Sequence, residues 1–311
     1  MTRRELLQLL GYTSGAMLLA PLSMARAATD PSKTSKLITR AVPPRGPVID
    51  ALPVIGLGSW ITFNVGDDAA GRANALEVMR AFFAAGGRLI DSSPMYGSAQ
   101  AVIGAALAQL GSPKALFGAD KVWTSGDGPK QIERTRAQWG VPRFDLLQVH
   151  NLTDWERQLP LLLEMRAAGR VRFVGITTSE GRRHAEMERV MRTHPIDFVQ
   201  LTYNIRDREA EQRLLPLAAE RGIAVIANRP FQQGALIDWA KRHPLPPWSQ
   251  EIDCTNWAQF LLKFIVSHPA LTCAIPATSQ VSHLHENMGA VRGRLPDAAF
   301  RRRMVSYIES L

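Results

Sequence analysis

Four polar residues at the ends of three successive apolar segments could together deliver a proton to a carbonyl oxygen. Asp91 ends one segment and is followed by Tyr96, Lys121 lies near the end of the next, and His150 ends the third. A phenol has an ordinary pKa near 10, and a neighbouring ammonium favours its ionised form. We therefore assign Tyr96 as general acid, Lys121 as the group that lowers its pKa, Asp91 as the partner of Lys121, and His150 as the group that orients the carbonyl.

None of these four side chains can carry a hydride, so a redox reaction at such a site needs a cofactor. Each residue alone has an ordinary structural interpretation. Asp91 could cap a turn, Tyr96 could pack, Lys121 could be solvated, and His150 could be a satisfied core residue. Their occurrence on consecutive segments makes chance a poor explanation.

The elements that would position these residues alternate between short apolar and helical segments. Strands are predicted over 53–58, 88–91, 115–123, 144–150, 171–176, 197–203, 223–227 and 271–276. Helices are predicted over 69–85, 99–110, 129–139, 155–168, 182–193, 207–221, 257–267 and 296–311. Alternation of this kind indicates parallel strands joined by crossovers. Eight units in roughly 250 residues favour an α/β fold, a single-domain (β/α)8 TIM barrel, whose C-terminal strand ends share one rim.

A doubly wound open sheet is the alternative architecture. It would usually place a glycine-rich phosphate loop after the first strand, and Gly56-x-Gly58 lacks the third glycine of that loop. Residues 231–256 form a long insertion after the seventh strand, and such loops in barrels commonly serve the ligand. We therefore favour the barrel and expect this insertion to close over a substrate, a structured segment with a packing role being the alternative.

Composition limits the classes of protein. The 311 residues are 46% hydrophobic, which excludes general disorder, and two cysteines exclude a disulfide scaffold. His283 and His285 are two positions apart and lack the spacing of helical metal ligands, so no metal site is expected. The net charge of +9 could reflect nucleic acid, a membrane or an anionic small molecule. No nucleic-acid-binding module is recognised and the arginines are dispersed, so we expect no nucleic-acid partner and attribute part of the charge to an anionic ligand.

Residues 1–27 resemble a twin-arginine (Tat) export signal. Arg3-Arg4 precede a modestly apolar stretch over 11–24, and Ala25-Arg26-Ala27 has the small residues of a cleavage site. The stretch is too short and too interrupted for a membrane span, so no stable membrane insertion is expected. We expect a signal over 1–27, an extended tether over 28–52 and the barrel with its C-terminal helix over 53–311. The Tat machinery moves folded proteins, which predicts a periplasmic location; an amphipathic first helix and an uncleaved anchor are the alternatives.

The sequence also resembles the aldo-keto reductase superfamily over about residues 53–295. The resemblance rests on Gly56-Leu57-Gly58, the segment 89–97 that contains Asp91 and Tyr96, Lys121-Val122-Trp123, and the segments 145–151, 169–176 and 200–204. It implies NAD(P)H-dependent reduction of aldehydes or ketones to alcohols, or the reverse oxidation. It also implies a cofactor bound extended on the barrel without a Rossmann domain, NADP(H) being usual and NAD(H) possible.

The resemblance further implies which residues contact the cofactor. Gln200 matches the glutamine that binds the nicotinamide carboxamide, Thr177-Thr178 replace a usual Ser-Asn pair, and Asn228 stands where an aromatic residue usually stacks. Glu286-Asn287 match an adenine-contacting pair at the start of a helix. The expected cofactor residues are Gly58, Ser59, Trp60, Thr177, Thr178, Gln200, Asn228, Arg229, Pro230, Phe231, Gly234, Thr278, Ser279, His283, Glu286 and Asn287. The expected substrate residues are Trp60, Trp123, Trp239 and Trp248.

Two other functions remain open at the level of sequence. The missing aromatic residue at Asn228 is compatible with a nicotinamide-nucleotide-binding regulator or redox sensor of the same fold with little turnover. The second open function is that of a barrel of another enzyme class, such as a metal-free lyase. The expected partners are a small carbonyl or alcohol substrate and the Tat machinery, and the expected state is a monomer or small homo-oligomer. Cys254 and Cys273 are expected to be free buried thiols, a disulfide between them being the alternative.

Overall fold

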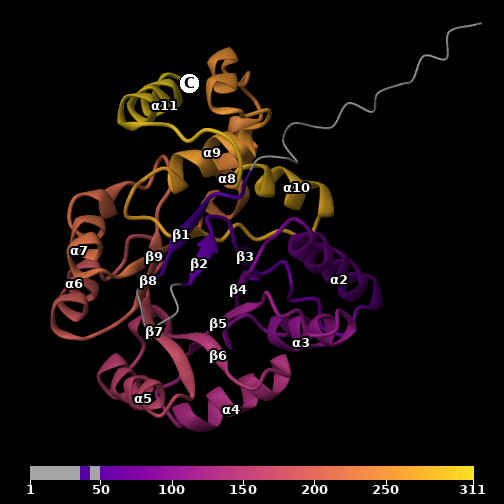
Figure 1. The fold of residues 1–311 in the computed structure, drawn as a ribbon, viewed down its shortest axis with the longest axis vertical. Helices are drawn as coiled ribbons and strands as arrows, with labels where there is room; N and C mark the ends of the chain where they lie inside the picture. The colour runs from indigo at the N-terminus through magenta and orange to yellow at the C-terminus, as the bar shows by residue number, and fades with distance from the viewer. Residues whose placement is uncertain (1–35, 43–49) are drawn as a thin grey trace, which may run out of the picture. The chain divides into compact units, whose positions relative to one another are not determined.

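In the computed structural model, which describes residues 36–42 and 50–311, a parallel sheet is surrounded by helices (Figure 1). Each strand pairs in parallel with the next one along the chain. The strands are β3 (Leu57–Gly58), β4 (Leu89–Asp91), β5 (Phe117–Val122), β6 (Phe144–Val149), β7 (Val171–Thr177), β8 (Phe198–Thr202), β9 (Ala224–Asn228) and β10 (Cys273–Ala274). This order is the one that the alternation of segments predicted.

The first and last strands of the sheet also meet. Bridges join Ile55 to Ala274 and Gly58 to Ala277, so the sheet closes on itself. A Cβ atom at Gly58 would lie 2.8 Å from the carbonyl oxygen of Ile275, so the missing side chain is what permits this close approach. The predicted (β/α)8 barrel is thereby confirmed.

The helices follow the strands and cover the outside of the sheet (Figure 1). They are α2 (Ala69–Ala84), α3 (Ala99–Gln109), α4 (Gly128–Trp139), α5 (Trp155–Ala167), α6 (His184–Thr193), α7 (Leu214–Arg221), α8 (Ala235–Ala240), α9 (Trp257–Val266), α10 (Val281–Gly289) and α11 (Ala298–Ser310). Short 3-10 turns are η1 (His150–Leu152), η2 (Glu209–Glu211), η3 (Gln232–Gly234) and η4 (Pro247–Ile252). The helix expected over 207–221 is divided into η2 and α7, because Pro216, which lacks an N–H, is accommodated in the first turn of a helix that begins at Leu214.

Side-chain caps fix where several of these helices begin. Asp68 accepts hydrogen bonds from backbone N–H groups at the start of α2, and Asp127, Asn256 and Asp297 do so for α4, α9 and α11. Each cap satisfies amide groups that the helix itself leaves unpaired, typically worth about 1 kcal/mol. The caps of α2 and α4 therefore fix the loops that follow β3 and β5, where two of the candidate site segments lie.

A two-stranded antiparallel sheet corrects part of the expected tether over 28–52. Strand β1 (Thr39–Ala41) pairs with β2 (Ala51–Pro53), and Figure 1 shows both lying across the barrel. Val42 and Leu52 are buried in a cluster that includes residues from the beginnings of the barrel strands. These residues therefore cover the N-terminal end of the barrel. Three-residue strands are too short to produce a recognisable alternation of apolar and polar residues.

Other sequence expectations concern export and the cysteines. The signal over 1–27 lies outside the described residues. Within residues 36–42 and 50–311, no helix has the length and apolar character needed to cross a membrane. Cys254 and Cys273 are both free and buried, as expected.

Candidate active site

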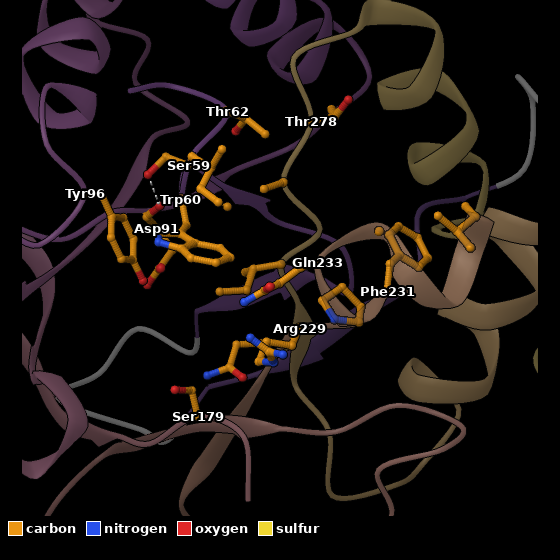
Figure 2. A pocket seen from close by; sticks show the side chains of 18 of the residues that line it. Ser59, Trp60, Thr62, Asp91, Tyr96, Ser179, Arg229, Phe231, Gln233 and Thr278 are labelled. Atoms are coloured by element: carbon orange, nitrogen blue, oxygen red, sulfur yellow. Dashed lines mark hydrogen bonds between the residues drawn. The ribbon is translucent and has the colours of Figure 1, made fainter. Parts of the chain in front are cut away.

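A cavity of about 460 Å³ lies at the C-terminal ends of the barrel strands (Figure 2). Asp91, Tyr96 and His150 line it, and the Lys121 ammonium lies directly behind Asp91. The four residues come from β4, the loop that follows it, β5 and the first position of η1, directly after β6. The parallel barrel thus brings together residues that are up to 59 positions apart along the chain, as predicted from the strand ends.

Lys121 and Asp91 form an ion pair that is almost completely buried. The Lys121 Nζ lies 2.6 Å from Asp91 Oδ2 and donates to the Ser92 carbonyl oxygen at 2.7 Å. The other carboxylate oxygen, Oδ1, accepts a hydrogen bond from Gln200 Nε2 at 2.8 Å. Burial is the largest single effect and lowers the pKa of Lys121, but the charges and the hydrogen bond around the ammonium, Asp91 foremost, together outweigh it and hold that pKa above its ordinary value of 10.5. The Lys121 ammonium therefore remains charged at neutral pH.

Tyr96 corrects one expectation about the pKa of the candidate acid. Burial is the larger effect and raises the pKa of Tyr96 above its ordinary value of 10, although the Lys121 ammonium acts in the expected, lowering direction. The Lys121 Nζ lies 5.1 Å from the centre of the Tyr96 ring. Tyr96 consequently keeps its proton at neutral pH. A phenolate formed there would lie beside a fixed positive charge.

His150 is held against Tyr96 and a buried serine. The two rings meet edge to face with centroids 5.6 Å apart, and the His150 Nδ1 lies 2.6 Å from Ser93 Oγ. Burial, together with the charge of Lys121, lowers the pKa of His150 well below its ordinary value of 6.5. The imidazole is therefore neutral at pH 7, and it lines the cavity.

Most of the expected cofactor residues lie around the same cavity. Those in its wall are Gly58, Ser59, Trp60, Thr177, Gln200, Asn228, Arg229, Pro230, Phe231, Gly234, Thr278, His283, Glu286 and Asn287. Figure 2 shows Ser59, Trp60, Asp91 and Tyr96 on one side of it, and Arg229, Phe231 and Gln233 on the other. Glu286 and Asn287 lie in the second half of α10, which corrects their expected place at the start of a helix.

Two expected cofactor residues do not line the cavity. The Thr178 hydroxyl points to the Met187 sulfur of α6 at 3.8 Å, because Thr178 lies beyond the end of β7 and its side chain faces the helix layer. Ser279 follows Thr278 in the last loop, and its carbonyl oxygen accepts a hydrogen bond from the Asn74 side chain. The paired hydroxyls expected at Thr177 and Thr178 therefore reduce to Thr177 alone.

The Asn228 amide makes hydrogen bonds within the protein through both its nitrogen and its oxygen. Its Nδ2 donates to the Thr178 carbonyl oxygen at 2.8 Å, and its Oδ1 accepts from the Thr202 hydroxyl at 2.8 Å. Asn228 therefore joins β9 to its neighbouring strand and loop. It offers no aromatic face to the cavity at the position where the resemblance expects one.

Sequence reasoning missed a group of polar residues in the segments that follow β7 and β9, the short helix α8 included. The cavity wall also contains Ser179, Glu180, Arg182, Gln233, Asp238 and Lys241. Arg229 donates to Glu180 at 3.1 Å, so the two loops are linked across the cavity. Ser179, Glu180 and Arg182 closely follow β7, and applying the strand-end rule to that loop as well would have found them, whereas Asp238 and Lys241 lie in and after α8 and have no such signal.

Three of the four tryptophans expected to contact substrate lie elsewhere, and only Trp60 is in the cavity wall. Trp123 is 41% exposed outside that wall. The Arg206 guanidinium lies 3.9 Å from the centre of the Trp239 ring. Trp248 packs against Phe260, Phe300 and Tyr307, since the second half of the 231–256 insertion folds onto α9 and α11. The expected lid is therefore corrected: residues 231–241 reach the cavity, and η4 belongs to the helical layer.

Exposed apolar side chains mark the mouth of the cavity instead. Ile61 and Met95, 62% and 43% exposed, both line it.

Among residues 36–42 and 50–311, no group of three or more His, Cys, Asp or Glu side chains is arranged to hold a metal ion.

Comparisons with known proteins agree with this geometry. The sequence profile of the aldo/keto reductase family matches residues 54–304. The methylglyoxal reductase YeaE of Escherichia coli is 26% identical over 257 residues, which cover 80% of this chain and 88% of YeaE. The aldo-keto reductase YhdN of Bacillus subtilis is 26% identical over 199 residues, 58% of this chain and 59% of YhdN.

A solved structure shares the fold. The aldo/keto reductase of Klebsiella pneumoniae, in complex with NADP and acetate, superposes with a TM-score of 0.70 at 24% identity, covering 83% of this chain and 92% of that one. The family match spans both the strands that form the barrel and the four residues grouped at its C-terminal end. The chain therefore belongs to the aldo/keto reductase family of NAD(P)-dependent oxidoreductases.

Proposed function

We propose that this protein reduces small aldehydes or ketones to alcohols, or oxidises the alcohols in reverse, with Tyr96 as general acid or base. The observation that carries the proposal is the buried Lys121–Asp91 ion pair placed beside a protonated Tyr96 in the cavity wall. The name of YeaE, a methylglyoxal reductase, supports a small dicarbonyl as a first substrate to test.

In this proposal, each residue acts on a carbonyl bound in the cavity. His150 is neutral and binds the carbonyl oxygen, and Tyr96 donates its proton to that oxygen as negative charge develops there. An alkoxide is a much stronger base than a phenolate, so this transfer stays favourable despite the raised pKa of Tyr96. The Lys121 ammonium stabilises the phenolate that remains, and Asp91 keeps Lys121 charged and in place. Solvent then returns a proton to Tyr96.

The cavity wall fits a dinucleotide cofactor, which supplies the hydride when bound. Arg182, Arg229 and Lys241 place cationic groups in the wall, as phosphates require. Gln200 presents an amide there whose Nε2 is already tied to Asp91. NADP(H) is the proposed cofactor, supported by the NADP and NADPH named for the Klebsiella pneumoniae structures, and NAD(H) is the alternative.

The test measures cofactor oxidation by the purified protein with methylglyoxal and a panel of aldehydes and ketones. Tyr96→Phe removes the donated proton, and we expect kcat to fall by about 10² to 10⁴. Tyr307→Phe is the matched control, because the Tyr307 hydroxyl bonds the Pro244 carbonyl oxygen away from the cavity. Equal rates for Tyr96→Phe and the unaltered protein would contradict the mechanism. Tight nucleotide binding with no turnover on any carbonyl would instead favour the regulator or redox sensor.

We also propose that the protein is exported folded to the periplasm by the Tat machinery. The proposal rests on Arg3-Arg4 and the residues up to Ala27. Cell fractionation of the full chain is expected to find it in the periplasm, and Arg3→Lys with Arg4→Lys is expected to retain it in the cytoplasm. Mass spectrometry of the exported protein would identify the cleavage site and any retained nucleotide. Export unaffected by the double substitution would exclude the Tat route.

A further inference from the structure

The Ser93 hydroxyl makes a contact that the proposed mechanism does not use. Its Oγ lies 2.6 Å from His150 Nδ1, and it accepts the Met95 backbone N–H at 3.1 Å. Ser93 is completely buried, and it is not part of the cavity wall. Substrate would therefore meet His150 but not Ser93.

These contacts decide which ring nitrogen of His150 carries the proton. The Met95 N–H already donates to Ser93 Oγ, so the Ser93 O–H needs an acceptor of its own. Within the described residues, Nδ1 of His150 is the acceptor in reach. If Nδ1 were protonated, it would have to donate to Oγ and leave the Ser93 O–H buried and unpaired. An unpaired buried donor costs about 1–3 kcal/mol.

We infer that Ser93 is a positioning residue that fixes the tautomer of His150, so that Nδ1 is unprotonated and the Nε2 carries the hydrogen. The Nε2–H is then the donor that His150 can offer to a carbonyl oxygen in the cavity. The same contact disfavours the imidazolium, because a protonated Nδ1 again leaves the buried Ser93 O–H without an acceptor. Ser93 thus adds to burial and to the Lys121 charge in keeping His150 neutral.

The other groups near His150 leave this assignment to Ser93. The Tyr96 ring packs against the imidazole edge to face, and Lys121 acts on it through its charge. Asp91, a carboxylate of the same site, has its oxygens occupied by Lys121, Gln200 and Gln148. The Ser93 hydroxyl is therefore the group that distinguishes the two ring nitrogens of His150.

The first experiment needs no variant of Ser93. Nitrogen NMR of the full protein labelled at histidine distinguishes protonated from unprotonated ring nitrogens, and the spectrum of His150→Gln identifies the signals of His150 among the seven histidines. We expect a protonated Nε2 and an unprotonated Nδ1 across neutral pH. A protonated Nδ1 would overturn the inference.

The second experiment compares two buried serines that are neighbours in sequence. Ser93→Ala is expected to release His150 into a mixture of tautomers, raise its pKa, and lower kcat/KM for a carbonyl by about tenfold. Ser92→Ala is the matched control, since the Ser92 hydroxyl bonds Ser59 Oγ and does not reach His150. The control is expected to leave the His150 signals unchanged. Unchanged His150 signals in Ser93→Ala would also overturn the inference.

The kinetic arm rests on the proposed carbonyl reduction, whereas the NMR arm does not. If no carbonyl is turned over but the His150 signals respond to Ser93→Ala as expected, the proposed function fails and the role of Ser93 stands. If Ser93→Ala does not fold, the spectrum of the unaltered protein decides alone.

Discussion

The Lys121–Asp91 ion pair at the C-terminal end of the barrel is enclosed by protein, whereas the ion pairs around Asp50 at the N-terminal end remain near the surface. The Lys121 and Asp91 side chains are 0% and 2% exposed. At the other end, Asp50 bonds Arg88 and Arg172, and the three side chains keep 11–30% of their surface exposed. A buried ion pair loses most of its hydration, while a partly exposed pair loses little.

The two ends also differ in backbone conformation, the less favourable conformations being found around the cavity. Ile61, Glu180, Arg229 and Gln233 have φ values between 50° and 62°, and all four line the cavity. For residues with a Cβ atom this left-handed conformation costs roughly 1–2 kcal/mol each. By contrast, the N-terminal end is covered by β1 and β2 with regular antiparallel pairing. The C-terminal end therefore holds groups in unfavourable positions, and packing elsewhere must stabilise the fold.

The N-terminal end supplies part of that stability. Phe117, Phe173 and Phe198 form an aromatic cluster with ring centroids 5.4–6.1 Å apart, and Leu52 of β2 is buried in the same group. The Arg172 guanidinium lies 5.1 Å from the centre of the Phe173 ring. The aromatic rings and Leu52 pack against one another, and the Arg172 guanidinium is paired with carboxylates and partly exposed to water. The comparison thus assigns chemistry to one end and closure of the barrel to the other.

The largest expected effect is at the buried ion pair. Lys121→Met leaves the Asp91 carboxylate enclosed without its cation, which is expected to lower the free energy of unfolding by about 3–5 kcal/mol and to abolish turnover. Denaturant unfolding and cofactor oxidation measure the two effects. Adding Asp91→Asn to Lys121→Met removes the unpaired charge and is expected to restore part of the stability but no activity. Lys130→Met, at an exposed position of α4, is the control. A stable, active Lys121→Met protein would contradict the assignment.

A second buried carboxylate tests the same end through pH. Asp120 points from β5 to α3, where Gln100 Nε2 donates to both of its oxygens, and burial raises its pKa from 3.8 to about 7. Because the folded-state pKa lies above the unfolded one, its contribution to stability is lost as pH rises from about 4 to 7. Asp120→Asn is therefore expected to stabilise the protein by on the order of 4 kcal/mol at pH 8. No difference is expected at pH 4, where the carboxyl is largely protonated in the folded protein. Equal unfolding curves at pH 8 would refute the shift.

At the N-terminal end, a substitution is expected to lower stability and leave activity unchanged. Leu52→Ala removes a completely buried side chain from β2 and is expected to cost about 2–3 kcal/mol. The kcat/KM of the folded protein should stay the same, because Leu52 lies at the end of the barrel opposite to the cavity. Leu311→Ala, at an exposed position, is the matched control. A fall in kcat/KM at full folding would show that the two ends are coupled.

The sequence predicted those strands and site residues whose apolar segments are long enough to show a pattern. Strands such as 144–149 are apolar runs long enough to recognise. His150 was found because it is a polar residue directly after such a run. The three-residue strands of the N-terminal end give no such pattern. Trp248 was misplaced because an aromatic residue in a loop does not reveal whether it faces the ligand or, as here, α11. The Ser93–His150 contact joins residues 57 positions apart and depends on side-chain geometry that sequence spacing does not encode.

The smallest expected effect gives the two ends opposite pH dependences. Arg88 and Arg172 outweigh burial and lower the pKa of Asp50 below its ordinary value of 3.8. A lowered folded-state pKa means that the contribution to stability is present above the unfolded pKa and lost as pH falls through the folded one. Asp50→Asn is expected to cost about 1 kcal/mol at pH 7 and little at pH 2, whereas Asp67→Asn, at an exposed position, should change little at either pH. Acidification therefore removes stabilisation at the N-terminal end, while at the other end it removes the penalty carried by Asp120. Unfolding measured across pH on Asp50→Asn and Asp120→Asn would separate the two, and curves of the same sign would refute the contrast between the ends.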